Sequence, residues 1–273
     1  MTTTTTTTIT EKYVELSHGK TRYFEAGSGE PLILVHGANV YNSGAVWAHI
    51  LHPLAEHFRV LAPDCLNWGP SDVFQQEFSF AYLVDHIREF MDALGIEKAN
   101  MAGHSMGGWI VTLFAYESPD RLNKVVLSSA GGVETRPLES MVEWKAPSEE
   151  QVRKTMEPRV PTLPPEISGD KLIEETLNKV SNPQHVQGFA NVMRHMTNPL
   201  TRSRYNTVRR LPHIKVPTLV LWGTDDHTND VRMAKVMHDG IPGAKLITFE
   251  GAGHGTFQER PADWTRAVIE FLR

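Results

Sequence analysis

The segment Gly-His-Ser-Met-Gly-Gly at residues 103–108 places a serine between two glycines. An apolar run precedes it and a helix-like segment follows, which is the setting of a sharp strand-to-helix turn. Such a turn strains the serine backbone, and Gly103 and Gly107 leave room that a side chain would fill. The hydroxyl of Ser105 would then be exposed as a nucleophile. The helix that begins there would direct its free N–H groups, that of Met106 first, at negative charge developing beside the serine.

A serine hydroxyl needs a histidine to accept its proton and a carboxylate to orient that histidine. Two apolar, β-branched segments at 218–222 and 245–249 read as buried strands, and each ends in a loop with such a group. The first loop carries Asp225 and Asp226, and the second carries His254 among three glycines. The order serine, aspartate, histidine is typical of one fold. Because the two aspartates are adjacent, either could supply the carboxylate.

Five ordered motifs resemble those of the α/β-hydrolase family, and the resemblance extends from about residue 13 to residue 273. They are His36-Gly37, the loop from Asp64 to Asp72, the segment around Ser105, Gly-Thr-Asp-Asp at 223–226 and Gly-Ala-Gly-His at 251–254. The resemblance implies that Ser105 is the nucleophile, His254 the general base and acid, and Asp226 the orienting carboxylate. It also implies that the backbone N–H groups of Ala38 and Met106 bind the oxyanion.

Strand patterns alternate with amphipathic helix patterns along most of the chain. Strands are expected at 13–16, 21–26, 31–35, 59–62, 99–102, 124–128, 218–222 and 245–249, and helices at 46–57, 80–94, 105–116, 230–238 and 262–272. The sequence therefore predicts an α/β fold, with a mostly parallel eight-stranded sheet flanked by helices. Residues 11–132 and 210–273 would form this core, behind a disordered tail at 1–10.

Residues 133–209 break this alternation. The stretch is rich in proline and shows helical patterns at 148–156, 170–180 and 185–196. We expect a helical cap, inserted after the strand that ends at Ser128 and lying over the serine. Five residues of the loops and the cap are candidates for substrate contact: His36, Asn39, Trp144, Met193 and Phe257. For His36, shaping the loop is the alternative role.

Composition limits the partners and the compartment. The 273 residues carry a net charge of −5 and no basic patch, so no nucleic-acid partner is expected. The threonine-rich start is neither a signal peptide nor a membrane span, and the single cysteine, Cys65, fits a cytoplasmic protein. Cys65 lacks a catalytic partner and is expected to be structural. His49 and His52 lack a third ligand at metal-site spacing, so neither a metal nor another cofactor is expected; the oligomeric state stays open.

The predicted reaction is acyl transfer from a small-molecule substrate to water, most simply from a carboxylic ester or lactone. The length, the cap after the sixth strand and three segments, Ser-Met-Gly-Gly at 105–108, Pro-Ser-Glu-Glu at 147–150 and Phe-Gln-Glu at 257–259, resemble the meta-cleavage-product hydrolases. Members of that group cut carbon–carbon bonds in ring-opened aromatic diketo acids. The chain departs from them at His104, where asparagine is common, at Gly255, where tryptophan is common, and after His36-Gly37, where a glycine-rich segment is common. Arg153 and Arg194 are the candidates for a cap arginine that binds a substrate carboxylate.

These patterns leave three functions open. An ester or lactone hydrolase is the first hypothesis and a carbon–carbon bond hydrolase the second. The third is a ligand-binding receptor that kept the fold without turnover. A haloalkane dehalogenase or an epoxide hydrolase is disfavoured, because each uses an aspartate where Ser105 stands.

Overall fold

The computed structural model describes residues 8–74, 78–137 and 139–273. Within these ranges eight strands form one sheet in the order β1-β2-β4-β3-β5-β6-β7-β8. Its strands are β1 (Thr10–Leu16), β2 (Gly19–Ala26), β3 (Pro31–Val35), β4 (Arg59–Pro63), β5 (Ala99–His104), β6 (Leu122–Ser128), β7 (Thr218–Gly223) and β8 (Lys245–Phe249). β2 is antiparallel to β1 and β4, and all other neighbours are parallel. The predicted mostly parallel sheet is confirmed.

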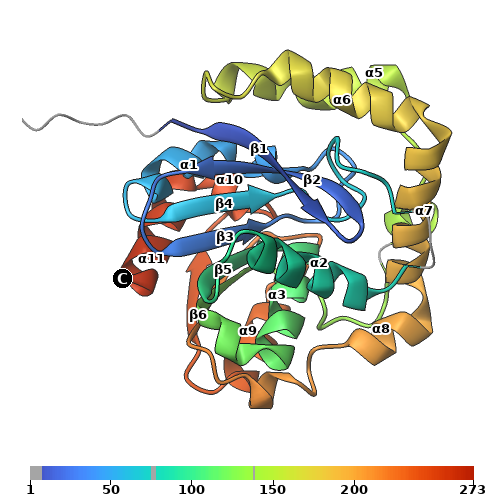
Figure 1. Cartoon of the computed structure of the whole chain (residues 1–273). Coiled ribbons are helices and arrows are strands. Elements are labelled where there is room, and N and C mark those ends of the chain that lie inside the picture. Colours follow the sequence, from blue (N-terminus) through green and yellow to red (C-terminus); the bar gives the residue numbers. More distant parts are fainter. Residues whose placement is uncertain (1–7, 75–77, 138) are drawn as a thin grey trace, which may run out of the picture.

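Helices cover both faces of this sheet (Figure 1). One face packs against α2 (Phe80–Ala93), α3 (Met106–Glu117) and α9 (Arg232–Gly240). The other face packs against α1 (Ala48–Ala55) and α11 (Pro261–Leu272), and the short α10 (Thr256–Glu259) precedes α11. Every residue of β5 and β7 is buried, as expected for parallel strands with helices on both sides. The carboxyl ends of these strands are therefore held by two packed cores.

The segment between β6 and β7 is helical, as the sequence predicts. It contains α4 (Glu139–Val142), α5 (Glu149–Met156), α6 (Gly169–Ser181), α7 (Pro183–Thr197) and α8 (Pro199–Tyr205). Ser148 begins α5 with a capping box that it forms with Gln151, and Asn182 caps α7, which has proline at its first position. In Figure 1, α5 and α6 lie above β1 and β2 at the top of the view, and α7 runs down the right side of the molecule to α8. The domain limits at 133 and 209 stay a prediction.

The predicted disordered tail at 1–10 overlaps residues that the structure places in the fold. Residues 1–7 lie outside the described residues, but Thr10 already begins β1. Ile9 is 4% exposed and belongs to the same apolar cluster as Ile167 of the inserted segment. Ile9 is packed in the core and Thr10 is part of β1, so the prediction of disorder is wrong for these two residues.

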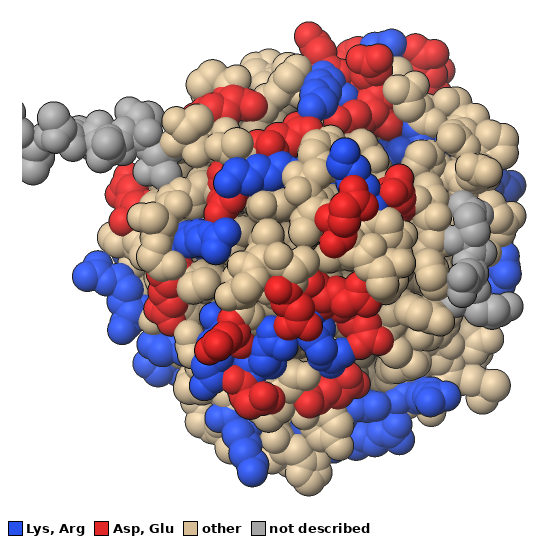
Figure 2. Space-filling model, viewed as in Figure 1, with Lys and Arg blue, Asp and Glu red and all other residues tan. Residues whose placement is uncertain are grey.

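Charged groups of both signs share the surface. Figure 2 shows acidic and basic side chains interspersed on the face it presents, including a mixed cluster near its centre. No helix among the described residues is both long enough and apolar enough to cross a bilayer.

Candidate active site

Ser105 stands between the last residue of β5 and the first residue of α3. Its backbone has φ 56° and ψ −116°, a conformation that side-chain-bearing residues rarely adopt and that costs on the order of 1–3 kcal/mol. The surroundings hold it there. Its N–H donates to the carbonyl of Ser128 at 3.1 Å, and its own carbonyl accepts from the N–H groups of Trp109 and Gly131 at 3.1 and 2.8 Å. The predicted sharp turn is therefore present and braced from both sides.

Two glycines make this turn possible. A Cβ added to Gly103 would lie 2.3 Å from the carbonyl oxygen of Gly107, and one added to Gly107 would lie 2.0 Å from the carbonyl oxygen of Val35. Both separations are far inside van der Waals contact. The helix can therefore start directly above the strand only because neither position has a side chain.

The structure joins His254 to Asp226. The Nδ1–H of His254 donates to Oδ2 of Asp226 at 2.8 Å, while Oδ1 of Asp226 accepts from the N–H groups of Thr228 and Asn229, both at 2.8 Å. Burial opposes ionisation of Asp226, but the hydrogen bond and charge of His254, with the two amides, hold the pKa of this carboxyl below its usual value. Asp225 is exposed, and its carboxylate accepts from the hydroxyl of Thr224 at 3.0 Å. Of the two aspartates, only Asp226 contacts the imidazole.

The loop that carries His254 is held by two side chains. The carboxylate of Glu259 accepts from the N–H groups of Gly253 at 2.8 Å and Gly255 at 3.2 Å, the residues on either side of His254. Nε2 of His104 hydrogen bonds to the carbonyl of His254 at 2.9 Å, and the centroids of the two imidazole rings lie 4.6 Å apart. Burial, followed by repulsion from His254, lowers the pKa of His104 to about 3, so His104 is neutral and donates from Nε2. A packed or hydrogen-bonding role was the sequence-based interpretation of His104, but sequence reasoning missed the contacts of Glu259, because they are not visible as a local pattern.

The hydrogen bonds between described residues include none from the Ser105 hydroxyl to His254. Catalytic contacts of this type are often long without substrate and tighten when substrate binds. The imidazole is fixed by Asp226 on one side and is 24% exposed.

The Ser105 cavity has a volume of about 540 Å³, and Ala38 and Met106 line it together with the serine. Met106 is the first residue of α3, so its N–H has no acceptor within the helix. A Cβ added to Gly37 would lie 3.0 Å from Cβ of Ser105, which puts the loop carrying Ala38 against the nucleophile. The two predicted oxyanion donors thus belong to two different segments that line one cavity with Ser105.

The structure separates the five candidate substrate contacts into two groups. Asn39, Trp144 and Met193 line a second cavity, of about 950 Å³, which also includes Ala38. His36 and Phe257 do not reach either cavity lining. His36 is fully buried, with Nε2 accepting from the N–H of Cys65 at 2.9 Å, and Phe257 is 1% exposed and packs on the ring of Trp47. Their packed positions leave no surface for a substrate to touch, so both belong to the scaffold.

Arg202 is a buried cation beside the serine that sequence reasoning did not select. It lines the Ser105 cavity, and its guanidinium donates to three backbone carbonyls, those of Glu134, Thr135 and Met196. Its guanidinium carbon, Cζ, lies over the ring of Trp109, 5.3 Å from the ring centroid. The guanidinium therefore ties α8 to the loop after β6.

Two further groups of residues bear on cofactors and reactive thiols. Burial raises the pKa of the Cys65 thiol far above its usual range, which makes it a poor nucleophile. Among the described residues, no three histidine, cysteine, aspartate or glutamate side chains gather as ligands of a metal ion.

Comparison with known proteins agrees with this fold. The pattern of the alpha/beta hydrolase family matches residues 32–268. The chain belongs to the α/β-hydrolase family. This α/β-hydrolase is 30% identical to a 2-hydroxy-6-oxo-6-phenylhexa-2,4-dienoate hydrolase of Comamonas testosteroni, over 97% of this chain and 94% of the relative.

Two other relatives point the same way. A 2-hydroxymuconate semialdehyde hydrolase of a Pseudomonas species is 29% identical, over 93% of this chain and 90% of its own length. The solved structure of a meta-cleavage product hydrolase from Pseudomonas fluorescens superimposes with a TM-score of 0.77 at 25% identity, covering 95% of this chain and 96% of the other. All three relatives are hydrolases, and this α/β-hydrolase is an enzyme of that class.

Proposed function

We propose that this α/β-hydrolase cleaves a carboxylic ester or lactone of a small organic molecule, with Ser105 as the nucleophile. The observation that carries the proposal is the hydrogen bond from His254 to Asp226, formed at the carboxyl end of the sheet that also presents Ser105 on its strained turn. Acyl transfer requires an imidazole held in one tautomer and a serine that a substrate can reach; His254 is held by Asp226, and the half-buried Ser105 lines a cavity.

The reaction follows from these contacts. Because Asp226 accepts the proton on Nδ1, His254 has its basic lone pair on Nε2, which takes the proton of Ser105 as the hydroxyl oxygen attacks the substrate carbonyl carbon. The N–H groups of Ala38 and Met106 donate to the carbonyl oxygen as it becomes negative. The intermediate then breaks its acyl–oxygen bond, and His254 protonates the departing alcohol. Water, deprotonated by the same imidazole, releases the acid and restores Ser105.

A second candidate is hydrolysis of a carbon–carbon bond in a ring-fission diketo acid. The similarity to the Comamonas hydrolase over nearly the whole chain favours it. The cap arginines do not support it: Arg153 pairs with Glu149 and Glu157 on the exposed face of α5, and Arg194 is exposed. The guanidinium of Arg202 is engaged by carbonyls, and Arg136, which is exposed, is the only other cation among the described residues that line the Ser105 cavity.

The test compares substrates on one preparation. We expect p-nitrophenyl butyrate or a small lactone to give a kcat/KM at least tenfold above that of 2-hydroxy-6-oxo-6-phenylhexa-2,4-dienoate. The opposite ratio would establish the second candidate instead.

A fluorophosphonate probe tests the nucleophile directly. It should label the wild-type enzyme and Ser129→Ala, whose buried hydroxyl is the nearby control, but not Ser105→Ala. Folded wild-type protein that is neither labelled nor active would favour the receptor hypothesis.

A further inference from the structure

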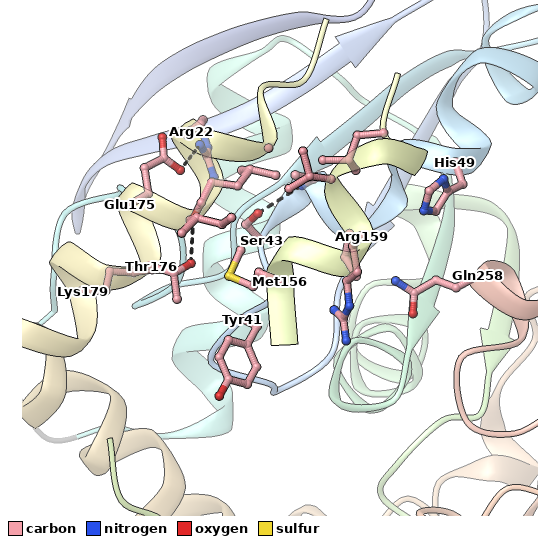
Figure 3. Close-up of a pocket in the computed structure, with 17 residues that line it drawn as sticks. Arg22, Tyr41, Ser43, His49, Met156, Arg159, Glu175, Thr176, Lys179 and Gln258 are labelled. Atoms are coloured by element: carbon pink, nitrogen blue, oxygen red, sulfur yellow. Dashed lines mark hydrogen bonds and ion pairs between the residues drawn. The ribbon is translucent and has the colours of Figure 1, made fainter. Parts of the chain in front are cut away.

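A third cavity, which we call the cap–core cavity, lies between the sheet and the inserted helices. The space between its walls, including its open mouth, is about 640 Å³. The core contributes Arg22 of β2 and residues 41–49, and the inserted segment contributes residues of α5 and α6 (Figure 3). It shares no lining residue with the Ser105 cavity. It is therefore a separate space, which the proposed reaction does not use.

Arg22 is the first unusual group in its wall. The side chain is fully buried, with Nε donating to Asp64 at 3.0 Å and Nη1 donating to Glu175 of α6 at 2.7 Å. Nη2 is buried and finds no hydrogen-bond acceptor among the described residues. A buried guanidinium donor without an acceptor costs about 1–3 kcal/mol or more, so a ligand oxygen at this point would recover free energy.

Lys179 is the second unusual group in the wall of the cap–core cavity. It lies one helical turn after Glu175 on α6 and is 8% exposed. No hydrogen bond or ion pair within 4.0 Å joins its amine to any residue that the structure describes, although Asp64 and Glu175 attract it from farther away. Burial, together with repulsion from Arg22, lowers the pKa of Lys179 to about 8. Two cationic side chains thus face one cavity, each with hydrogen-bonding capacity that its neighbours leave unused.

The rest of the wall defines the ligand further. The charged side chains of the lining are Arg22, Arg159, Lys179 and one carboxylate, Glu175, and Asp64 pairs with Arg22 from outside the lining, so three cations are opposed by two carboxylates. His49 and Tyr41 are its other titratable groups. The remaining surface is largely aliphatic: Ala45, Val46, Met156, Val160, Leu163, Leu172 and Ile173. Such a wall suits a molecule with one anionic end and an apolar body.

We propose that the cap–core cavity binds a monocarboxylic acid with an apolar tail, its carboxylate lying between Nζ of Lys179 and Nη2 of Arg22. A carboxylate fits this place because it has two oxygens, one for each unused donor, and because its charge relieves the repulsion between the two cations. The tail would lie against the aliphatic residues of α5 and α6. Tyr41 lines both this cavity and the one that contains Ala38, so a bound acid would also contact the loop that leads to the oxyanion donor.

The test measures binding rather than turnover. Calorimetric titration of Ser105→Ala protein with octanoate should give saturable binding, and octanamide, of the same length but uncharged, should bind at least tenfold more weakly. Lys179→Met should reduce octanoate affinity at least tenfold. Lys98→Met, at an exposed lysine, and Met233→Ala, in the wall of the Ser105 cavity, should leave it within twofold.

A second measurement guards against a misfolded variant. Octanoate should slow acetylation of Lys179 by an N-hydroxysuccinimide ester, followed by mass spectrometry, whereas octanamide should not. Equal binding of octanoate and octanamide, no effect of Lys179→Met, or no saturation at millimolar octanoate would overturn the proposal. None of these results depends on hydrolysis, so a failure of the ester reaction is distinguishable from a failure of this site.

Discussion

The substitution Asp226→Asn is the sharpest test of the candidate site, because the neighbouring hydrogen bonds fix the orientation of the new side-chain amide. Oδ1 of Asp226 accepts two backbone N–H groups, from Thr228 and Asn229. An amide group at this position must keep its oxygen toward those two donors, since its nitrogen cannot accept them. Its NH₂ then faces Nδ1 of His254, which must accept the hydrogen bond and carry its own proton on Nε2.

An imidazole in that tautomer cannot take the proton of Ser105. For the serine triad, the equivalent change lowers kcat about 10⁴-fold, which is about 5.4 kcal/mol of transition-state stabilisation. We expect a loss of this size for Asp226→Asn, measured as kcat for p-nitrophenyl butyrate. The free energy of unfolding in urea should fall by only about 1–2 kcal/mol, because one charge-assisted hydrogen bond becomes a neutral one.

Asp225→Asn is the matched control. That carboxylate is exposed and accepts from the Thr224 hydroxyl, so the change should alter kcat less than twofold. If Asp225→Asn abolished activity while Asp226→Asn retained more than a tenth of it, the assignment of the orienting carboxylate would be refuted.

Two further predictions concern stability. Because Ser105 has φ 56°, Ser105→Gly should be about 1 kcal/mol more stable to urea than Ser105→Ala, after the greater backbone freedom of glycine when unfolded is counted; equal stability would mean that the turn is not strained. His86 is buried, and burial lowers its pKa to about 4, below the unfolded value of about 6.5. The unfolded chain then binds more protons, so stability is full above pH 6.5 and falls toward pH 4, by about 2 kcal/mol at pH 5 from this residue. His86→Gln should show a shallower loss between pH 7.5 and 5 in urea titrations, and an unchanged slope would contradict this.

Features that depend on neighbouring residues could be predicted from the sequence. The strands, the glycine-flanked serine and the helices α5, α6 and α7 each carry their signal within a short window, and the structure has them all. The short helix α8 begins at Pro199, directly after α7, so its pattern merges with that of its neighbour. It was therefore not expected as a separate helix.

Features that depend on contacts between distant segments could not be predicted. Lys179 lies on an amphipathic helix and reads as a solvated charge, but the core beneath α6 buries it. Residue type alone does not distinguish Asp225 from Asp226, and the prediction of Asp226 comes from the resemblance to the α/β-hydrolase family. The hydrogen bonds from Gly253 and Gly255 to the carboxylate of Glu259 are donated by backbone N–H groups, so no residue type in the sequence indicates them.

The ion pair between Arg22 and Glu175 has a consequence for protein engineering. Exchange of the helical segment between relatives is an obvious way to alter specificity, but a transplanted segment without an acid at this place would leave Nη1 of Arg22 without its acceptor, with Asp64 still paired to Nε. Removing the acceptor of one buried donor costs about 1–3 kcal/mol, and more for a charged group, which is a large part of the net stability of a typical domain. Chimeras built on this core should therefore keep a glutamate facing β2, or replace both residues together.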